Sequence, residues 1–338
     1  MPQDFSRPPT LRDVAARAGV DRSLVSKVIN NDPRLSIPDR TRERVMRAIE
    51  ELDYQPNLVA RGLRTTQTYM FAFRLPELTN PVYAPIIAGA QRRAMEHGYV
   101  IAVMGLDQLA PDANQTQRVR RVDGVLLASG TLPDDAVRGL VEIDTPTVVV
   151  NRRVDGVASS ILVDDEAGSQ LATEHLLDRG HRNLAVLTGP RGIDTSDRRL
   201  EGFQRAVDAV AGTRSEVVHA EGWSGSAGYE AGCELLARSA VTAVFAATSM
   251  LGIGLLRAAH EAGRLVPDHL SIVTLHDSDW LNYTVPPLTA VAMPMEALGA
   301  AAVDQLLRLV QGESSQASVV TEPGPALVVR ESTAAPPV

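Results

Sequence analysis

A short segment near the N-terminus gathers side chains that can make hydrogen bonds with nucleic acid. The polar residues of segment 21–29 recur at helical spacing, so a helix there would place four of them on one face: Arg22, Ser23, Ser26 and Lys27. That face carries no acidic side chain. Guanidinium, ammonium and hydroxyl groups donate hydrogen bonds to base edges and to phosphates. The pattern therefore predicts a base-reading face, although a solvated helix face has the same composition.

Three helices would position this face. Thr10 is a favourable N-cap for a helix over residues 11–18, and Gly19 supplies the left-handed turn that ends such a helix. A second helix over 22–29 and a third over about 39–53 turn their apolar residues toward the same core. Two short helices joined by a tight turn are typical of a helix-turn-helix. A three-helix bundle with a solvated outer face is the alternative.

The charge of the chain is divided unevenly. Its net charge is −8, which by itself argues against binding to nucleic acid. Residues 1–64, however, hold 11 Arg and one Lys against 9 Asp or Glu, which gives +3. The rest holds 21 basic and 32 acidic residues, which gives −11. A small basic module on an acidic body is the asymmetry expected when one end contacts phosphates.

Beyond residue 69, apolar strand-like runs alternate with amphipathic helical runs. Strand-like runs begin at Met70, Tyr99, Val122, Thr147, Leu184, Val241 and Leu270. Buried strands separated by helices predict parallel sheets that are covered on both faces, with ligands bound at the carboxyl ends of the strands.

Several function classes find no support in the sequence. Cys233 is the single cysteine, so neither an intrachain disulfide nor a cysteine-built metal site can form. No Gly-x-Ser-x-Gly elbow, His-Glu-x-x-His helix or Gly-rich phosphate loop occurs, so we expect no catalytic residues, no cofactor and no enzyme activity. His181 is interpreted as structural. With no membrane-spanning run and no secretory signal, the expected location is the cytoplasm.

The N-terminal region contains a dense set of motifs: Thr10-Leu11-Arg12-Asp13-Val14-Ala15-Ala16-Arg17-Ala18-Gly19-Val20-Asp21, Val25-Ser26-Lys27-Val28-Ile29-Asn30, Thr41-Arg42-Glu43-Arg44-Val45 and Leu52-Asp53-Tyr54-Gln55-Pro56-Asn57. Together they resemble the headpiece of the lactose repressor (LacI/GalR) family of bacterial transcription regulators. The resemblance implies that the base readers are Arg22, Ser23 and Lys27. It also implies contacts with DNA phosphates by five residues: Thr10, Ser26, Asn30, Tyr54 and Asn57. Pro38 departs from the family's usual serine cap and makes the start of the third helix uncertain.

The segment that follows the headpiece is too short to be a stable helix by itself, because helix nucleation is costly below about 12 residues. Residues 57–64 resemble the family's hinge helix, which forms where two subunits meet over the minor groove. The resemblance implies DNA contacts by Ala60, a wedge at Leu63 and a groove-entering side chain at Arg64. A flexible linker is the alternative, and it is the expected state without DNA.

The body also carries family landmarks: Leu78-Thr79-Asn80-Pro81, Arg121-Val122-Asp123-Gly124, His175-Leu176-Leu177-Asp178-Arg179-Gly180-His181, Leu200-Glu201-Gly202-Phe203, Val266-Pro267 and Pro286-Pro287-Leu288-Thr289. They imply a two-lobed α/β domain with parallel sheets over 68–338 that resembles periplasmic binding proteins. With the N-terminal motifs, the resemblance implies an all-α helix-turn-helix headpiece over 1–56 and a hinge over 57–67. The implied lobes comprise about 68–163 with 291–322, and 164–290.

The resemblance also implies an effector site between the lobes. The matching positions are Tyr83, Thr195, Arg199, Trp223, Thr248, His276 and Asp277. An aromatic platform beside arginine and carboxylate side chains suits a sugar. Two departures weaken that interpretation, because relatives often carry Asn-Asp at Thr248-Ser249 and Asp at His276.

The sequence therefore predicts a homodimeric repressor, with a tetramer left open, whose affinity for double-stranded operator DNA is controlled by a sugar or related metabolite. The alternative is a DNA-binding regulator with a degenerate or non-sugar cleft. A periplasmic transport receptor shares the body, but it requires an export signal and has no helix-turn-helix. Whether the effector releases the operator or acts as a co-repressor stays open, as do the identities of the operator and the effector.

Overall fold

The computed structural model describes residues 9–29, 35–54, 67–106, 122–141 and 145–337. The chain divides into two compact units, Met1–Tyr69 and Met70–Val338. We call the first unit the headpiece and the second the body, and each is described by itself.

The described part of the headpiece contains the three predicted helices, α1 (Leu11–Ala18), α2 (Arg22–Ile29) and α3 (Asp39–Glu51). The first two have the predicted bounds, and the third begins at Asp39, directly after Pro38, and ends two residues earlier than expected.

Local chemistry explains both ends of α1. At its start the Thr10 backbone N–H and hydroxyl donate to the Asp13 carboxylate at 2.8 and 2.6 Å. At its end Gly19 adopts φ 61°, which glycine tolerates without strain. Val14, Val25 and Val45, one from each helix, meet in the headpiece core. The turn and this shared core together fix the angle at which α2 is presented.

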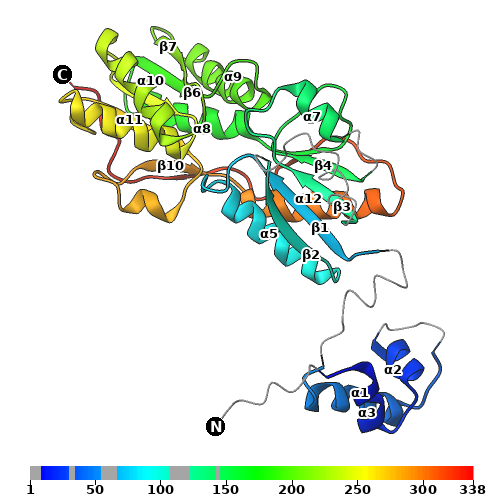
Figure 1. Cartoon of the computed structure of the whole chain (residues 1–338). Helices are drawn as coiled ribbons and strands as arrows, with labels where there is room; N and C mark the ends of the chain where they lie inside the picture. The colour runs from blue at the N-terminus through cyan, green and yellow to red at the C-terminus, as the bar shows by residue number, and fades with distance from the viewer. Residues whose placement is uncertain (1–8, 30–34, 55–66, 107–121, 142–144, 338) are drawn as a thin grey trace. The chain divides into compact units, whose positions relative to one another are not determined.

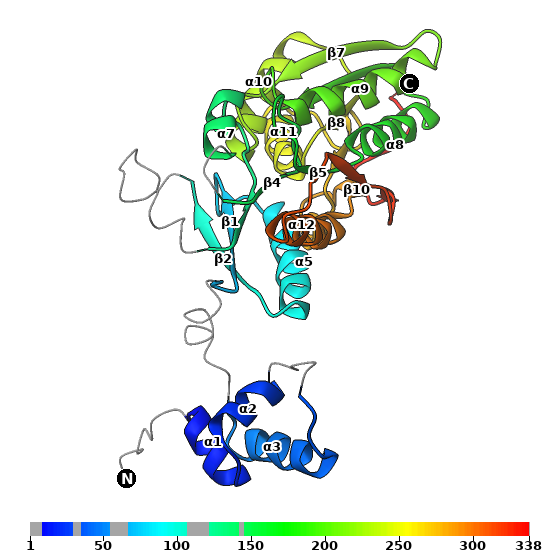
Figure 2. The same cartoon turned by 90° about the vertical axis from the view of Figure 1, so that its right-hand side faces the viewer.

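The body contains two six-stranded sheets among its described residues, in the orders β11-β5-β4-β3-β1-β2 and β12-β10-β9-β8-β6-β7 (Figures 1 and 2). The first comprises β1 (Met70–Leu75), β2 (Val100–Gly105), β3 (Gly124–Leu127), β4 (Thr147–Val150), β5 (Ser160–Val163) and β11 (Ser318–Val320). The second comprises β6 (Asn183–Thr188), β7 (Arg214–His219), β8 (Ala243–Ala246), β9 (Ser271–Leu275), β10 (Thr289–Ala292) and β12 (Ala326–Val328). All their pairings are parallel except that of β10 with β12, which confirms the predicted parallel sheets.

Helices cover the sheets, and six of them pack in pairs. Lobe one, built on the first sheet, carries α5 (Tyr83–Glu96), α7 (Asp134–Val141) and α12 (Met295–Val310). Lobe two, built on the second, carries α8 (Asp165–Asp178), α9 (Asp194–Asp208), α10 (Gly225–Arg238) and α11 (Ser249–Glu261). The two views agree that α5 lies beside α12, and contacts also join α8 with α9 and α10 with α11.

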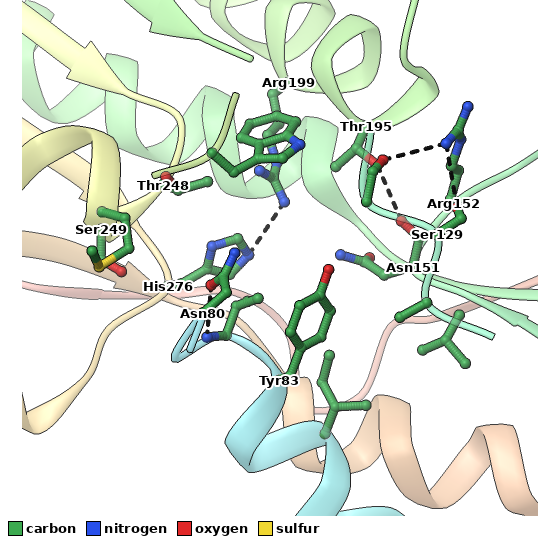
Figure 3. Close-up of a pocket in the computed structure, with 17 residues that line it drawn as sticks. Asn80, Tyr83, Ser129, Asn151, Arg152, Thr195, Arg199, Thr248, Ser249 and His276 are labelled. Carbon is green, nitrogen blue, oxygen red and sulfur yellow. Dashed lines mark hydrogen bonds between the residues drawn. The ribbon is translucent and has the colours of Figure 1, made fainter. Parts of the chain in front are cut away.

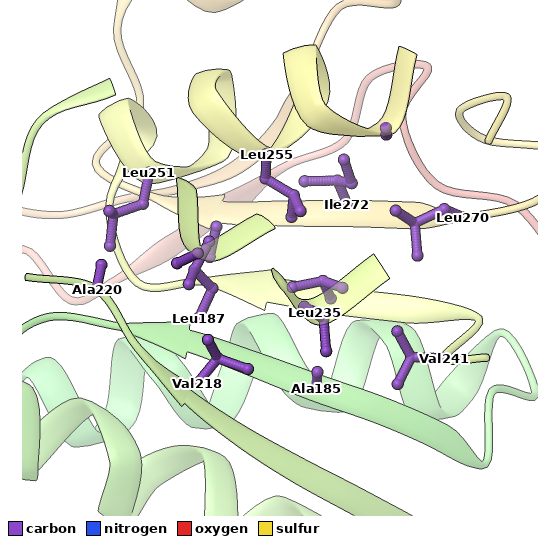
Figure 4. Close-up of a cluster of buried hydrophobic side chains, with 14 of the residues drawn as sticks. Ala185, Leu187, Val218, Ala220, Leu235, Val241, Leu251, Leu255, Leu270 and Ile272 are labelled. Carbon is purple, nitrogen blue, oxygen red and sulfur yellow. The ribbon is translucent and has the colours of Figure 1, made fainter. Parts of the chain in front are cut away.

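The core of lobe two shows why the sheet is buried on both faces. Alternate strand residues such as Leu187 and Ile272 pack under Leu251 and Leu255 of α11 (Figure 4). Their neighbours along the strands, such as Phe245, point the opposite way, because successive strand side chains alternate between faces. Both sets are fully buried, so the strands read as continuous apolar runs in the sequence.

The chain crosses between the lobes three times within the described residues. The crossings follow β5 at residue 163, β10 at residue 292 and β11 at residue 320. The division of the lobes predicted from the sequence falls after residue 163, where the first crossing lies, and after residue 290, which is inside β10. That prediction ended lobe one at 322 and left residues 323–338 in neither lobe. The structure places β12 in the second sheet, so that this last stretch returns to lobe two.

Candidate ligand pocket and nucleic-acid interface

A pocket lies at the carboxyl ends of strands from both sheets, where the fold class predicts ligands to bind (Figure 3). Its cavity volume is about 60 Å³. Lobe one contributes Asn80, Val82, Tyr83, Ile86, Ala128, Ser129, Gly130, Val150, Asn151 and Arg152. Lobe two contributes Thr195, Arg199, Trp223, Thr248, Ser249, Met250 and His276. Six of the seven effector residues expected from the sequence therefore line one pocket.

Arg199, in the second turn of α9, is held from several directions and is 2% exposed. Its Nε donates to Asp165 Oδ1 at 2.7 Å, and its Nη1 donates to the Ala247 carbonyl at 3.0 Å. Its Nη2 lies 3.3 Å from Nε2 of His276, and its Cζ lies 5.1 Å from the centre of the Trp223 ring. These contacts fix the guanidinium against the wall of the pocket.

Asp165 balances the charge of two neighbouring arginines. It is fully buried at the start of α8, and its second oxygen accepts from Arg198 Nη1 at 2.5 Å. Burial alone would raise the pKa of Asp165, but Arg199 and Arg198 outweigh that effect and the net pKa is lowered. Arg198 is further paired with Asp194 at 3.0 Å. Two guanidiniums thus face two carboxylates, which leaves this wall of the pocket close to neutral.

His276 follows β9 and is neutral. Burial, with a smaller effect from Arg199, lowers its pKa to about 3, although Asp165 opposes the shift. Because a guanidinium can only donate, Nε2 of His276 must accept the hydrogen bond from Arg199. The ring proton therefore resides on Nδ1. Within the described residues this Nδ1 has no hydrogen-bond partner. His276 is nevertheless buried, with 5% of its surface exposed.

Two aromatic side chains complete the pocket. The indole of Trp223 lies so close to the backbone at Gly189 that a Cβ there would be 2.3 Å from Trp223 Cη2. Tyr83, the first residue of α5, enters from lobe one. Burial, together with Glu77, raises the pKa of Tyr83 to about 12 against the opposing effect of Arg199, so its hydroxyl is protonated at neutral pH.

Hydrogen bonds join the two lobes beside the pocket. The Thr195 hydroxyl of lobe two donates to the Asn151 carbonyl of lobe one at 3.1 Å. The Arg153 backbone N–H donates to Asp194 Oδ2 at 2.9 Å. Thr195 thus lines the pocket as expected, but its hydroxyl proton is already used between the lobes.

Asp277 is the one expected effector residue that does not line this pocket. Its carboxylate lies 2.8 Å from Nη2 of Arg330, and the residue lines a neighbouring cavity of about 520 Å³ instead. The backbone turns at His276, whose φ is 66°. Of the two adjacent residues, His276 lines both cavities, whereas Asp277 lines the second alone.

Sequence reasoning missed six polar residues of this region, among them Asn80 and Ser249 of the pocket lining. Ser129, Asn151 and Arg152 lie within two residues of the ends of β3 and β4 and line the pocket. Asp165 binds Arg199 from the side away from the cavity. The signal for Ser129, Asn151 and Arg152 was their position after apolar runs, at the carboxyl ends of strands. The guanidinium of Arg152 is bound by groups of its own lobe: its Nη1 donates to the Leu132 carbonyl at 2.6 Å and its Nη2 pairs with Asp134.

In the headpiece, the predicted base readers Arg22, Ser23 and Lys27 are exposed on α2 and Ser26 is half-buried. The Tyr54 ring packs into the core and is 7% exposed, so a phosphate contact remains a prediction for its hydroxyl alone. The remaining DNA-contact predictions lie outside the described residues: Asn30, Asn57, Ala60, Leu63 and Arg64. Thr10 lies at the N-terminus of α1, with its hydroxyl donating to Asp13.

Both parts of the chain match known family models. Residues 10–57 match the bacterial regulatory proteins of the lacI family, and residues 173–333 match the periplasmic binding protein-like domain. Among the described residues, no helix is both long and apolar enough to span a bilayer.

Relatives cover nearly the whole chain. The HTH-type transcriptional regulator DegA of Bacillus subtilis (strain 168) is 32% identical over 332 residues, which cover 96% of this chain and 98% of that protein. A solved complex of the transcriptional regulator CelR with cellobiose is 32% identical, with a TM-score of 0.69 and coverage of 96% and 99%. The lac repressor dimer bound to operator and the anti-inducer ONPF is 27% identical, with a TM-score of 0.77 and coverage of 97% and 100%.

Proposed function

Because the chain belongs to the lacI family of bacterial transcriptional regulators, we propose that it is a repressor whose operator affinity is set by a small molecule bound at Arg199. The observation that carries this proposal is the composition of the pocket, which takes side chains from both lobes. A ligand that contacts both lobes favours one angle between them. Since it acts only through its differential affinity for the two lobe arrangements, DNA must alter ligand affinity by the same factor.

The DNA-binding end of the proposal rests on α2. Its exposed face presents Arg22, Ser23 and Lys27, and its first turn contains no acidic residue. One such helix makes few base contacts, so we propose that two copies bind a near-palindromic operator. Three exposed apolar side chains near the end of lobe two favour self-association: Trp280, Tyr283 and Val285 are 70%, 77% and 89% exposed.

Coupling between the two ends would pass through residues 57–64. A change of lobe angle would alter the distance between the two copies of this segment, which we expect to become helical only when they pack together over the minor groove. Ligand and operator would therefore each change the binding of the other by changing the distance between the two copies of residues 57–64.

The second candidate is a regulator whose cleft takes a non-sugar effector or none. The neutral His276, with no partner on its Nδ1–H, is the specific observation that favours a change of effector. A fully degenerate cleft is the further alternative, because the buried pair of Arg199 and Asp165 would also stabilise the body without a ligand.

The test combines operator selection with ligand titration on the full-length protein. An operator selected from a randomised DNA pool is titrated by gel shift, with and without compounds that raise the melting temperature. Arg22→Ala is expected to lose operator preference but keep ligand binding. Thr248→Val, a pocket variant, is expected to weaken the ligand response and keep ligand-free operator binding. A wild-type protein with salt-independent DNA affinity, or one whose bound ligand leaves operator affinity unchanged, would refute the proposal.

A further inference from the structure

The first two turns of α9 contact lobe one. The Asp194 carboxylate accepts a hydrogen bond from the Arg153 backbone N–H at 2.9 Å. The Arg198 guanidinium donates to the Val163 carbonyl at 3.1 Å. Val163 is the last residue of β5, where the chain first crosses between the lobes. With the bond from Thr195 described above, three hydrogen bonds from one short stretch of α9 reach lobe one.

Asp194 is held in this position from within its own lobe. Its Oδ2, which accepts from Arg153, also accepts from Arg198 Nε at 3.0 Å. Arg198 is fixed in turn by the buried Asp165 at 2.5 Å, and the same Asp165 binds Arg199 of the pocket at 2.7 Å. The four side chains of this chain of charges are at most 19% exposed. Separating any of them from its partner would leave a poorly hydrated charge, which is unfavourable.

An acidic residue at the start of a helix has a simpler explanation. Asp and Glu are favourable in the first turn because they compensate the positive end of the helix dipole. Asp197 lies in the same turn and fits that explanation, because it is exposed and its carboxylate forms no hydrogen bond or ion pair with the described residues. Asp194 differs, because its carboxylate reaches the backbone of the other lobe.

We propose, building on the function proposed above, that Asp194 is a positioning residue that holds α9 on lobe one and thereby sets the angle between the lobes. We call Asp194, with its bonds to Arg153 and Arg198, the latch. Separation of the lobes moves Arg153 and Val163 away from α9 together. The bond between Thr195 and lobe one therefore opens in the same step as the latch.

The latch also connects the lobe angle with the ligand pocket. Asp165 binds both Arg198 of the latch and Arg199 of the pocket. A ligand that displaces Arg199 changes the charge that Arg198 faces, and through Arg198 it changes the hold on Asp194. Ligand and lobe arrangement thus act on one buried carboxylate, so each alters the equilibrium of the other.

Amide hydrogen exchange at Arg153 measures how often the latch opens, because this N–H exchanges only after it leaves Asp194. The exchange is followed by mass spectrometry with residue resolution on the full-length protein without ligand. Thr195→Val removes the separate bond to Asn151 and leaves the latch residues unchanged. If the bonds open together, Arg153 should exchange about two- to tenfold faster, because one hydrogen bond contributes a factor of that order to the opening equilibrium. Asp197→Ala, in the same turn, is the matched control and should exchange as the wild type does.

Asp194→Ala tests whether the latch sets the lobe angle, with acrylamide quenching of tryptophan fluorescence as the readout. Both tryptophans lie in the body, and Trp280 is 70% exposed, so an increase in quenching reports greater access to Trp223 in the pocket. Loss of a hydrogen bond to a charged group should shift the equilibrium about tenfold toward separated lobes and raise the quenching. Asp194→Asn keeps an oxygen that can accept from Arg153 and should restore part of the wild-type value. Asp197→Ala should be quenched as the wild type is.

Two results would overturn the inference: exchange at Arg153 that is no faster in Thr195→Val than in Asp197→Ala, or quenching that is no greater in folded Asp194→Ala than in the wild type. The first result does not depend on the stability of Asp194→Ala. Ligand-free operator affinity of Asp194→Ala, which is expected to differ from that of the wild type, reports separately on the proposed function. If the latch opens as described but operator affinity stays the same, the latch stands and the coupling of lobe angle to DNA falls.

Discussion

Replacing Arg199 with alanine is expected to affect the stability of the body as well as its ligand. The side chain is 2% exposed, and its loss leaves the fully buried Asp165 with Arg198 as its remaining guanidinium partner. Removing one member of a buried ion pair costs about 3–5 kcal/mol, because the other charge stays buried. Since Arg198 still compensates Asp165, we expect the lower end, a loss of about 3 kcal/mol in the free energy of unfolding.

The measurement is urea unfolding of the full-length protein, followed by circular dichroism, with the midpoint and slope analysed separately. Arg92→Ala is the matched control, because its ion pair with Glu296 has side chains that are 65% and 56% exposed. An exposed pair contributes less than about 1 kcal/mol, so the control midpoint should hardly move.

The same Arg199→Ala protein should bind operator without ligand at a temperature where it is folded, and should not respond to effector. Two results would refute this reasoning. One is a loss of unfolding free energy no greater than that of Arg92→Ala, which would mean that Asp165 does not depend on Arg199. The other is a wild-type effector response, which would remove Arg199 from the ligand site.

Three further outcomes are expected. Burial lowers the pKa of His175 to about 4, so as the pH drops below about 6.5 the unfolded chain binds a proton before the folded chain does, and stability falls. Between pH 7 and 5 this residue should lower the free energy of unfolding by about 2 kcal/mol. In thermal unfolding measured across this pH range, His175→Gln should abolish that loss. Gly189→Ala should displace the Trp223 indole, since the added Cβ would lie 2.3 Å from it, and an unchanged tryptophan fluorescence response to ligand would contradict this. Arg22→Ala should relax base preference by about 1–3 kcal/mol in operator selection while Asn57→Ala weakens all sequences alike, and retention of the wild-type preference by both variants would make the assignment of Arg22 wrong.

Much of the fold follows from local patterns. The helices over 11–18 and 22–29 were predictable because a cap, a glycine turn and apolar spacing agree within a few residues. The strands were predictable because burial on both faces removes polar residues from their whole length. The return of β12 to lobe two was not, because it depends on a pairing with β10 more than 30 residues away.

The pocket, too, contains residues that local patterns predict and residues that depend on remote contacts. Residues such as His276 fall there because they follow strands whose carboxyl ends share one edge of a sheet. The position of Asp277 outside this pocket could not be predicted, because its partner, Arg330, is remote in sequence. The pairing of Thr195 with Asn151 depends on how closely the lobes approach, which no local pattern encodes. Asp165 reads in the sequence only as an acidic residue at the start of a helix.

The three crossings have a consequence for the order in which the protein can fold as it is synthesised. Strands β1 to β5 leave the ribosome before residue 164, but α12, which covers β3, β4 and β5, begins only at residue 295. At about 5–20 residues per second, the interval between them lasts on the order of ten seconds. During that time the sheet face that includes Leu126 and Val148, both fully buried in the finished body, lacks this cover. Nascent chains that end before α12 are therefore expected to engage chaperones and to aggregate or be degraded. Lobe two, whose strands β6 to β10 are made without interruption, should acquire most of its sheet first.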